Sequence, residues 1–190
     1  PHDDALIELH VRHVPGGAFT DHVFHGMAEK TILRIQAPLG TFILREASDR
    51  PMIFVGGGTG FAPLKGMIEH AMHRGIRRPM HLYWGVRSRR DIYLPALPER
   101  WARDWPDFTY TPVLSEPDPD WSGRIGFVHE AVVADHPDMR GFDIYMSGPP
   151  AMVEAGRLTC EARGATMDHM FSDAFTYAKD DNGPRADGPP

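Results

Sequence analysis

Three short segments of the sequence could bind an anionic ligand, and each directly follows an apolar run. The first is GGGTGFAP at residues 56–63. Its glycines let the backbone approach a ligand without a Cβ in the way, and a helix that begins after them offers free N–H groups to a phosphate. We interpret this segment as a phosphate-binding turn; the alternative is a tight strand-to-helix turn that binds no ligand.

The spacing of these glycines differs from two common nucleotide-binding motifs. Read from Gly56 or from Gly58, the dinucleotide pattern G-x-G-x-x-G needs a further glycine where Phe61 and Pro63 stand. The Walker pattern fails at Lys65, which is neither preceded by glycine nor followed by Ser or Thr. The segment therefore predicts phosphate binding without either fingerprint.

The second segment is the basic run WGVRSRRDI at residues 84–92. At this position in a dinucleotide site, an arginine can accept a 2′-phosphate or stack on adenine, and an acid can hold a 2′-hydroxyl. Arg87 and Asp91 are therefore candidates for contacts with an adenosine. The alternative is an exposed charged loop.

The third segment is YMSGPP at residues 145–150. Ser147 does not fit the hydrolase pattern G-x-S-x-G, because Tyr145 stands where that pattern needs its first glycine. Ser147, Gly148 and Pro149 are candidates for ligand binding because they follow a predicted strand. An ordinary helix start is the alternative.

The sequence contains 11 histidines and one cysteine, and we expect no metal site among them. Histidines spaced by three occur at positions 10/13, 22/25 and 70/73, but surface histidines are the commoner explanation. His129 and Glu130 open the zincin pattern H-E-x-x-H, yet Val133 stands where the second histidine belongs. Cys160 alone cannot form a disulfide or a four-thiolate iron–sulfur cluster within this chain, so we expect a packed core thiol.

Composition and charge argue against several classes of protein. The 190 residues have a net charge of −6, and their 20 Lys and Arg are scattered, so nucleic acid is not an expected partner. No stretch approaches the roughly 20 apolar residues of a membrane span. A single cysteine favours a reducing, cytoplasmic compartment.

Strands that alternate with helices must position the three segments. The pattern predicts strands at 52–55, 80–84, 108–113, 142–146 and 166–171, and helices at 63–74, 95–104, 127–134 and 151–163. This alternation is typical of the α/β class, with a parallel five-stranded sheet flanked by helices. The carboxyl ends of the strands would form a ligand crevice.

The first part of the chain has a different pattern. Alternating apolar residues predict strands at 5–13, 31–35 and 42–44, with a short helix at 20–28. We therefore divide the chain into part of an antiparallel domain at 1–47, a nucleotide-binding domain at 48–178 and a disordered tail at 179–190. The first part is too small to fold alone.

The most specific segments are RPMIFVGGGTGFAP at 50–63, YWGVR at 83–87, WSGRIG at 121–126 and FSDAF at 171–175. Together they resemble the ferredoxin–NADP reductase superfamily, and within it NADH-dependent flavin reductases and oxygenase reductases. The resemblance extends over residues 5–178. It implies a flavin-binding β-barrel followed by a pyridine-nucleotide domain, with a hydride passing from the nicotinamide to the flavin.

The resemblance also implies roles for single residues. The residues that would hold the flavin pyrophosphate are Gly17, Ala18, Phe19 and Thr20. Those that would hold the dinucleotide are Gly57, Gly58, Thr59, Gly60, Ser147, Gly148 and Pro149, with Arg87 and Asp91 at its adenosine end. Thr59 and Ser147 beside the nicotinamide, and Phe175 near the flavin ring, are the expected catalytic residues.

The expected cofactors are FAD and NADH, with NADPH as the alternative coenzyme. Relatives have an Arg-x-Tyr-Ser flavin motif before the strand that is predicted here from residue 5, so we expect this chain to lack most of the barrel and to hold flavin weakly. Electrons would pass to an iron–sulfur protein, an oxygenase component or free flavin. Two alternatives stay open, a free-flavin reductase and a nucleotide-binding module without turnover.

Overall fold

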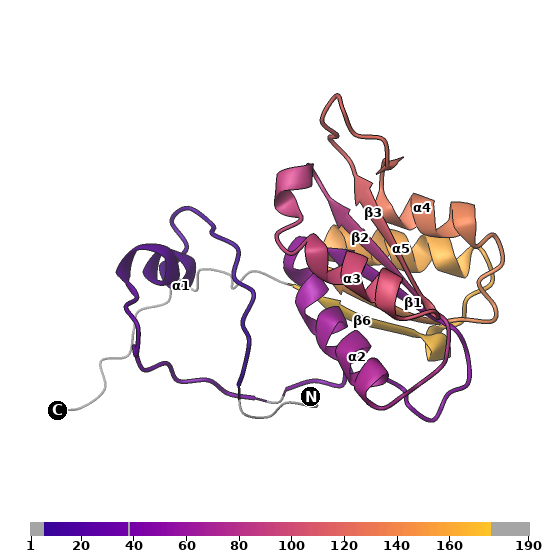
Figure 1. Ribbon diagram of the computed structural model, residues 1–190, viewed down its shortest axis with the longest axis horizontal. Helices are drawn as coiled ribbons and strands as arrows, with labels where there is room; N and C mark the ends of the chain where they lie inside the picture. The colour runs from indigo at the N-terminus through magenta and orange to yellow at the C-terminus, as the bar shows by residue number, and fades with distance from the viewer. Residues whose placement is uncertain (1–5, 38, 176–190) are drawn as a thin grey trace, which may run out of the picture.

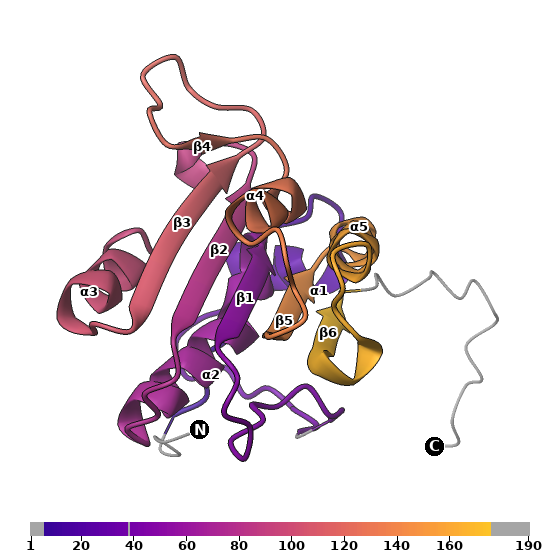
Figure 2. The same ribbon diagram turned by 90° about the vertical axis from the view of Figure 1, so that its right-hand side faces the viewer.

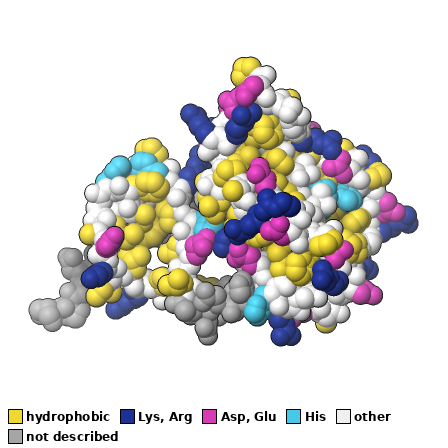
Figure 3. Space-filling view, viewed as in Figure 1, with side chains coloured by type: hydrophobic (Ala, Val, Ile, Leu, Met, Phe, Trp, Pro, Cys, Tyr) yellow, Lys and Arg dark blue, Asp and Glu magenta, His cyan; other side chains and the backbone are white. Residues whose placement is uncertain are grey.

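The computed structural model describes residues 6–37 and 39–175. From β1 onward the chain forms one α/β unit, in which helices cover both faces of a parallel sheet (Figures 1 and 2). The preceding segment contains two short helices, α1 (Ala18–Asp21) and the π-helix η1 (His22–Gly26). The part that carries these helices lies away from the sheet (Figures 1 and 3), whereas Glu8 pairs with Lys65 and His10 bonds to Tyr93 of the α/β unit. The predicted tail at 179–190 lies outside the described residues.

The sheet contains six parallel strands in the order β4-β3-β2-β1-β5-β6. Its strands are β1 (Met52–Gly57), β2 (Met80–Val86), β3 (Phe108–Leu114), β4 (Arg124–Ile125), β5 (Asp143–Gly148) and β6 (Met170–Ala174). The predicted parallel sheet between helices is confirmed, with one strand more than predicted. The additional strand, β4, is two residues long and is too short to leave a hydrophobic pattern in the sequence.

Two helices pack on each face of the sheet. They are α2 (Phe61–His73) and α3 (Ala96–Asp104) on one face, and α4 (Val128–Asp135) and α5 (Pro150–Glu161) on the other. Three 3-10 turns, η2 (Gly58–Gly60), η3 (Arg89–Asp91) and η4 (Met167–His169), complete the unit. Neighbouring residues of β1 enter opposite cores, Phe54 on the face covered by α2 and Val55 on the face covered by α4 and α5. Burial on both sides explains the continuous apolar run in this strand.

Two expectations from composition can be compared with the structure. Cys160 is buried in α5, as predicted, with 1% of its surface exposed. Burial raises the pKa of its thiol to about 11, so the side chain behaves as a packed apolar group. Within the described part of the chain, no helix has the length and hydrophobicity needed to cross a lipid bilayer.

The antiparallel strands predicted for the N-terminal segment are not found in residues 6–37 and 39–51. The predicted helix is present, as α1 and η1, and begins at Ala18. A strand needs a hydrogen-bonded neighbour, and no strand in the described part of the chain pairs with these residues. Accordingly, Leu6 is 80% and Ile32 94% exposed. The strand prediction is therefore wrong for this segment, because alternation alone cannot supply a pairing partner.

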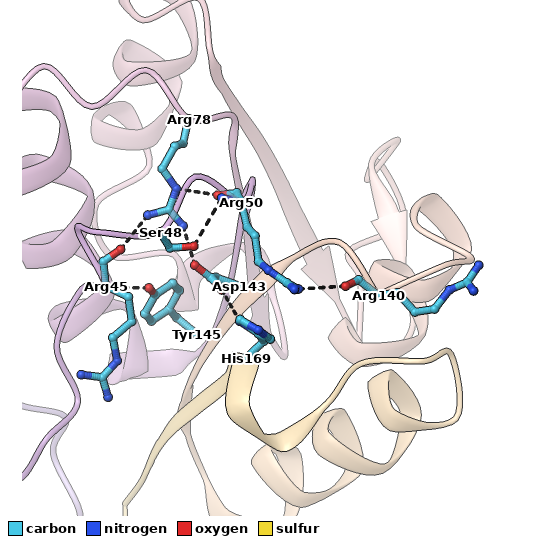
Figure 4. A network of polar contacts seen from close by, with 8 residues as sticks. All are labelled: Arg45, Ser48, Arg50, Arg78, Arg140, Asp143, Tyr145 and His169. Atoms are coloured by element: carbon cyan, nitrogen blue, oxygen red, sulfur yellow. Dashed lines mark hydrogen bonds and ion pairs between the residues drawn. The ribbon is translucent and has the colours of Figure 1, made fainter.

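A buried polar network attaches this segment to the amino ends of the strands (Figure 4). The guanidinium of Arg78 pairs with Asp143 at 2.5 Å, and the two side chains are 8% and 1% exposed. Arg78 also donates hydrogen bonds to the backbone carbonyls of Arg45 and Arg50. His169 shares a hydrogen bond of 2.8 Å with the other carboxylate oxygen of Asp143. The buried charges thus have several partners, as low-dielectric surroundings require.

We expect Asp143→Asn to lower the free energy of unfolding by about 3 kcal/mol, because it leaves the charge of Arg78 buried without its counter-ion. Urea denaturation followed by circular dichroism measures the change. Asp138→Asn is the matched control, since Asp138 pairs with Arg140 on the surface and such pairs contribute little. An equal effect of the two substitutions would contradict a stabilising role for the buried pair.

Candidate functional site

The carboxyl ends of β1, β2 and β5 bring the three predicted ligand-binding segments to one edge of the sheet. In the strand register, Gly56 is paired with Trp84 of β2 and with Ser147 of β5. Figure 2 shows the three strands side by side. We call residues 57–60, 85–87 and 147–149 the strand-end edge. In open parallel sheets, ligands bind outside the carboxyl ends of the strands.

The glycine turn and the serine turn are in direct backbone contact. A Cβ added to Gly60 would lie 2.0 Å from the carbonyl oxygen of Ser147. A Cβ added to Gly57 would lie 2.5 Å from Sδ of Met152. A Cβ added to Gly148, whose φ is +147°, would lie 3.0 Å from the backbone of Gly57. Packing therefore explains why these three positions are glycines. It does so whether or not a ligand binds.

Gly58 is different, because its Cβ position has no atom within 4 Å. Its φ of +54° favours glycine, and its backbone borders open space next to the half-buried Thr59. The turn is held in place by Trp84, whose indole Nε1 donates a 2.9 Å hydrogen bond to the Gly58 carbonyl. Trp84 in turn stacks on Phe61 with ring centroids 4.1 Å apart. A ligand can approach the strand-end edge here without displacing a side chain.

The hydroxyl of Ser147 has no hydrogen-bond partner within the described part of the protein, although the residue is 0% exposed. A buried hydroxyl without a partner costs about 1–3 kcal/mol. Ser147 is the register neighbour of Gly56, one residue before the strand-end edge segment 57–60, so a ligand bound at this edge is a candidate for the missing partner. This orphaned group is the most direct sign of a binding function.

Phe175 lies at the same edge, beyond the end of β6. Its backbone N–H donates a 2.9 Å hydrogen bond to the carbonyl of Gly148. The residue is 36% exposed. The structure thus places Phe175 beside Gly148 at the strand-end edge, with the residue partly exposed.

The basic turn after β2 places its two candidates differently. Arg87 is exposed and lies 3.9 Å from Glu116. The carboxylate of Asp91 accepts hydrogen bonds from the backbone N–H and the hydroxyl of Ser88, both at 3.0 Å. Asp91 therefore stabilises the η3 turn, while Arg87 points away from the fold. Trp84 belongs to the basic segment identified from the sequence but has no predicted role there, and Glu116 is not identified; only its position next to a strand end could have indicated it.

The predicted flavin-binding turn does not lie at the strand-end edge. Gly17 is the N-cap residue of α1 and Thr20 lies within this helix, which Figure 1 places well away from the sheet. The Thr20 hydroxyl donates to the carbonyl of Val14 at 2.9 Å and accepts from its N–H at 3.1 Å. In this arrangement the hydroxyl closes the turn itself. The first-turn N–H groups of Ala18 and Phe19 are the groups that a helix start offers to an anion.

The sequence profile of the oxidoreductase NAD-binding domain family matches residues 54–157. The chain belongs to this family. The match covers the whole strand-end edge, from the glycine turn to the serine turn. The resemblance to ferredoxin–NADP reductases and the α/β fold expected from it are thereby confirmed, as is pyridine-nucleotide binding as the family's property.

Relatives of this NAD-binding domain are reductase components. The chain is 40% identical over 179 residues to the CDP-6-deoxy-L-threo-D-glycero-4-hexulose-3-dehydrase reductase of Yersinia pestis, covering 94% of this chain and 54% of that protein. It is 36% identical over 173 residues to the ferredoxin–NAD(P)+ reductase component of the naphthalene 1,2-dioxygenase system of Pseudomonas putida, covering 91% and 53%. The chain spans about half the length of these curated relatives.

A solved structure extends the comparison to three dimensions. The cytochrome P450 reductase GcoB of Amycolatopsis superposes with a TM-score of 0.81 at 40% identity, covering 90% of this chain and 52% of that one. The likeness therefore includes much of the N-terminal segment as well as the NAD-binding domain.

A hollow with a volume of about 340 Å³ lies at the opposite, amino edge of the sheet. His81 and His136 line it and share a 3.2 Å hydrogen bond, and His81 also bonds to Thr111. Burial, with the neighbouring His136, lowers the pKa of His81 to about 4. Burial also lowers the pKa of His136, so both histidines pack as neutral groups at neutral pH.

We expect Gly60→Ala to destabilise the fold by at least about 2 kcal/mol, because the new methyl group would overlap the Ser147 carbonyl. It should also weaken NADH binding at least about tenfold, since the strand-end edge must open. Urea denaturation and isothermal titration calorimetry measure the two effects. Gly141→Ala, where a Cβ would meet nothing within 4 Å, is the control. Unchanged affinity in Gly60→Ala would place the NADH site elsewhere.

Stability should fall as the pH is lowered from 7 to 5. The unfolded chain takes up a proton at His81 near the ordinary pKa of 6.5, whereas the folded chain resists it down to about 4. After allowance for partial exposure, the loss is about 1 kcal/mol. Urea midpoints at each pH measure it, and His81→Gln should flatten the profile whereas His22→Gln should not. A profile that His81→Gln leaves unaltered would contradict this assignment.

Proposed function

We propose that this chain is the pyridine-nucleotide part of a cytoplasmic flavoprotein reductase, which uses NADH to reduce FAD and passes electrons to an iron–sulfur protein or an oxygenase component. The proposal rests chiefly on one observation, the buried and unpartnered hydroxyl of Ser147 beside the open backbone of Gly58. The reductase components among its relatives support the same reaction class.

The strand-end edge provides groups suited to each part of a dinucleotide. The backbone at residues 57–60 and the start of α2 present N–H groups and a positive dipole end to the pyrophosphate. Ser147 and Thr59 can hold the nicotinamide amide by hydrogen bonds. Gly148 adds no side chain beside them, and Pro149 is the N-cap residue of α5.

Bound NADH supplies a hydride and a bound flavin accepts it, so the protein's contribution is to position the rings and exclude water. Phe175 is suited to the second task, because its ring is apolar, partly exposed and adjacent to Gly148. Thr59, Ser147 and Phe175 are therefore the proposed catalytic residues. Gly17, Ala18, Phe19 and Thr20 are the proposed contacts to the flavin pyrophosphate, through backbone N–H groups.

The surroundings of Arg87 favour NADH over NADPH. Its guanidinium lies 3.9 Å from the carboxylate of Glu116, and the Glu116 N–H donates a 2.8 Å hydrogen bond to the Arg87 carbonyl. An acid beside the arginine repels a 2′-phosphate and can accept a hydrogen bond from a 2′-hydroxyl. Asp91 contributes by stabilising the η3 turn, which directly follows Arg87 and Ser88.

A free-flavin reductase is the second candidate function, since the segment FSDAF at 171–175 resembles both branches. The two differ in whether the reduced flavin leaves the protein. Gel filtration of the protein after anaerobic reduction separates them: a protein-bound flavin supports the electron-transfer component, and a released flavin supports the free-flavin reductase.

We expect Ser147→Ala to slow flavin reduction by NADH at least about tenfold while NADH affinity changes little, because the lost hydroxyl orients the reacting ring. Anaerobic stopped-flow measurement of flavin bleaching, with FAD supplied to the purified chain, gives the rate. Ser147→Cys should keep most of it, since a thiol also donates a hydrogen bond.

Thr109→Ala, on the far end of β3, is the matched control and should leave the rate unchanged. NADH binding without any flavin reduction would overturn the reductase proposal for this chain and identify a nucleotide-binding module. Absence of NADH binding would contradict both.

A further inference from the structure

A group of potential metal ligands lies in the N-terminal segment, far from the strand-end edge. One ligand atom each of His13, Asp21 and His25 lies within 4.8 Å of the others. No metal site is expected here from the sequence, in which neighbouring histidines are three residues apart. The structure instead combines a histidine that precedes the turn with two residues of the helices that follow it.

Local structure explains why these side chains meet. Asp21 ends α1 and His25 lies in η1, so they are four residues apart and lie on the same face of a helical turn. The chain reverses at Gly16, whose φ is +79°, and this turn brings His13 back against that face. The backbone N–H of Gly16 donates a 3.0 Å hydrogen bond to one oxygen of Asp21, which orients the carboxylate.

The other oxygen of Asp21 lies 2.6 Å from Nε2 of His13. That contact lowers the pKa of the Asp21 carboxyl, so the carboxylate is ionised at neutral pH. The His25 ring meets the His13 ring edge-on, with centroids 5.1 Å apart. The ring centroids of Phe24 and His13 lie 5.0 Å apart. The two imidazoles and the carboxylate therefore lie close together, with the apolar ring of Phe24 beside them.

We propose that His13, Asp21 and His25 form a binding site for a first-row divalent cation of the Zn²⁺ type. Two imidazoles and one carboxylate are a ligand set that Zn²⁺ uses when its fourth position is left to water or another ligand. Zn²⁺ holds such ligands at about 2.0–2.2 Å, so the ligand atoms of a tetrahedral site lie about 3.4 Å apart. The His13–Asp21 contact of 2.6 Å must therefore open when the cation binds, and any pair of ligand atoms near the 4.8 Å limit must close. The proton that His13 and Asp21 share passes to solvent when the cation binds.

A cation bound at this site would stabilise the turn at residues 14–17. Its three ligands lie on both sides of that turn, so a bound cation would fix the start of α1 relative to the chain before it. This inference does not depend on the proposed reductase activity, because none of the three residues belongs to the strand-end edge.

The test uses the whole chain, freed of metal by a chelator. ZnCl₂ is titrated by isothermal titration calorimetry, and Co²⁺ absorption in the visible region reports the coordination geometry. We expect about one equivalent to bind with a micromolar dissociation constant, and the Co²⁺ spectrum to have the intensity of a four-coordinate site. His25→Gln and Asp21→Asn should each weaken binding at least about tenfold.

His22→Gln is the matched control, because His22 lies in the same π-helix but outside the ligand group. It should leave both the affinity and the spectrum unchanged. The exposed side chain of His25 can be altered without disturbing the core, and circular dichroism verifies that each variant is folded. Equal binding by wild type and a folded His13→Gln/His25→Gln variant, or no binding at micromolar Zn²⁺, would overturn the proposal.

Discussion

The structure depends on a contact between two strand ends that leaves no space for a side chain. The ideal Cβ of Gly60 would lie 2.0 Å from the Ser147 carbonyl, and that of Gly148 would lie 3.0 Å from the backbone of Gly57. This contact brings the turn after β1 against the turn after β5. It thereby places the buried Ser147 hydroxyl next to the open backbone of Gly58, and these groups together make the proposed nucleotide site.

The amino and carboxyl edges of the sheet have different structural roles. At the amino edge, Arg78 and Asp143 form a buried ion pair with further hydrogen bonds, and they fix the strands and the segment before them. At the carboxyl edge, the open backbone of Gly58 and the Ser147 hydroxyl, which has no partner among the described residues, are available to a ligand. The amino edge thus holds the strands in place, and the carboxyl edge offers groups that can bind a cofactor. A protein whose cofactor carries the chemistry needs both, because its own task is to position that cofactor.

Much of this arrangement follows from the sequence, for physical reasons. The apolar run before the glycines predicts β1, and the placement of the three turns after strands predicts that they share an edge. The N-terminal strands were predicted wrongly, because alternation at Leu6 or Ile32 does not reveal whether a partner strand exists. β4 is too short to detect. Contacts between distant residues, such as His13 with His25 or Arg78 with Asp143, leave no local pattern.

The most direct test of the account is to map NADH binding onto the chain by the backbone amide shifts of isotopically labelled protein. The account predicts that the largest changes occur at residues 57–60 and at Ser147 and Gly148, with smaller ones near Arg87. Shifts that gather around His81 and His136 at the opposite edge, or no saturable shifts, would contradict it.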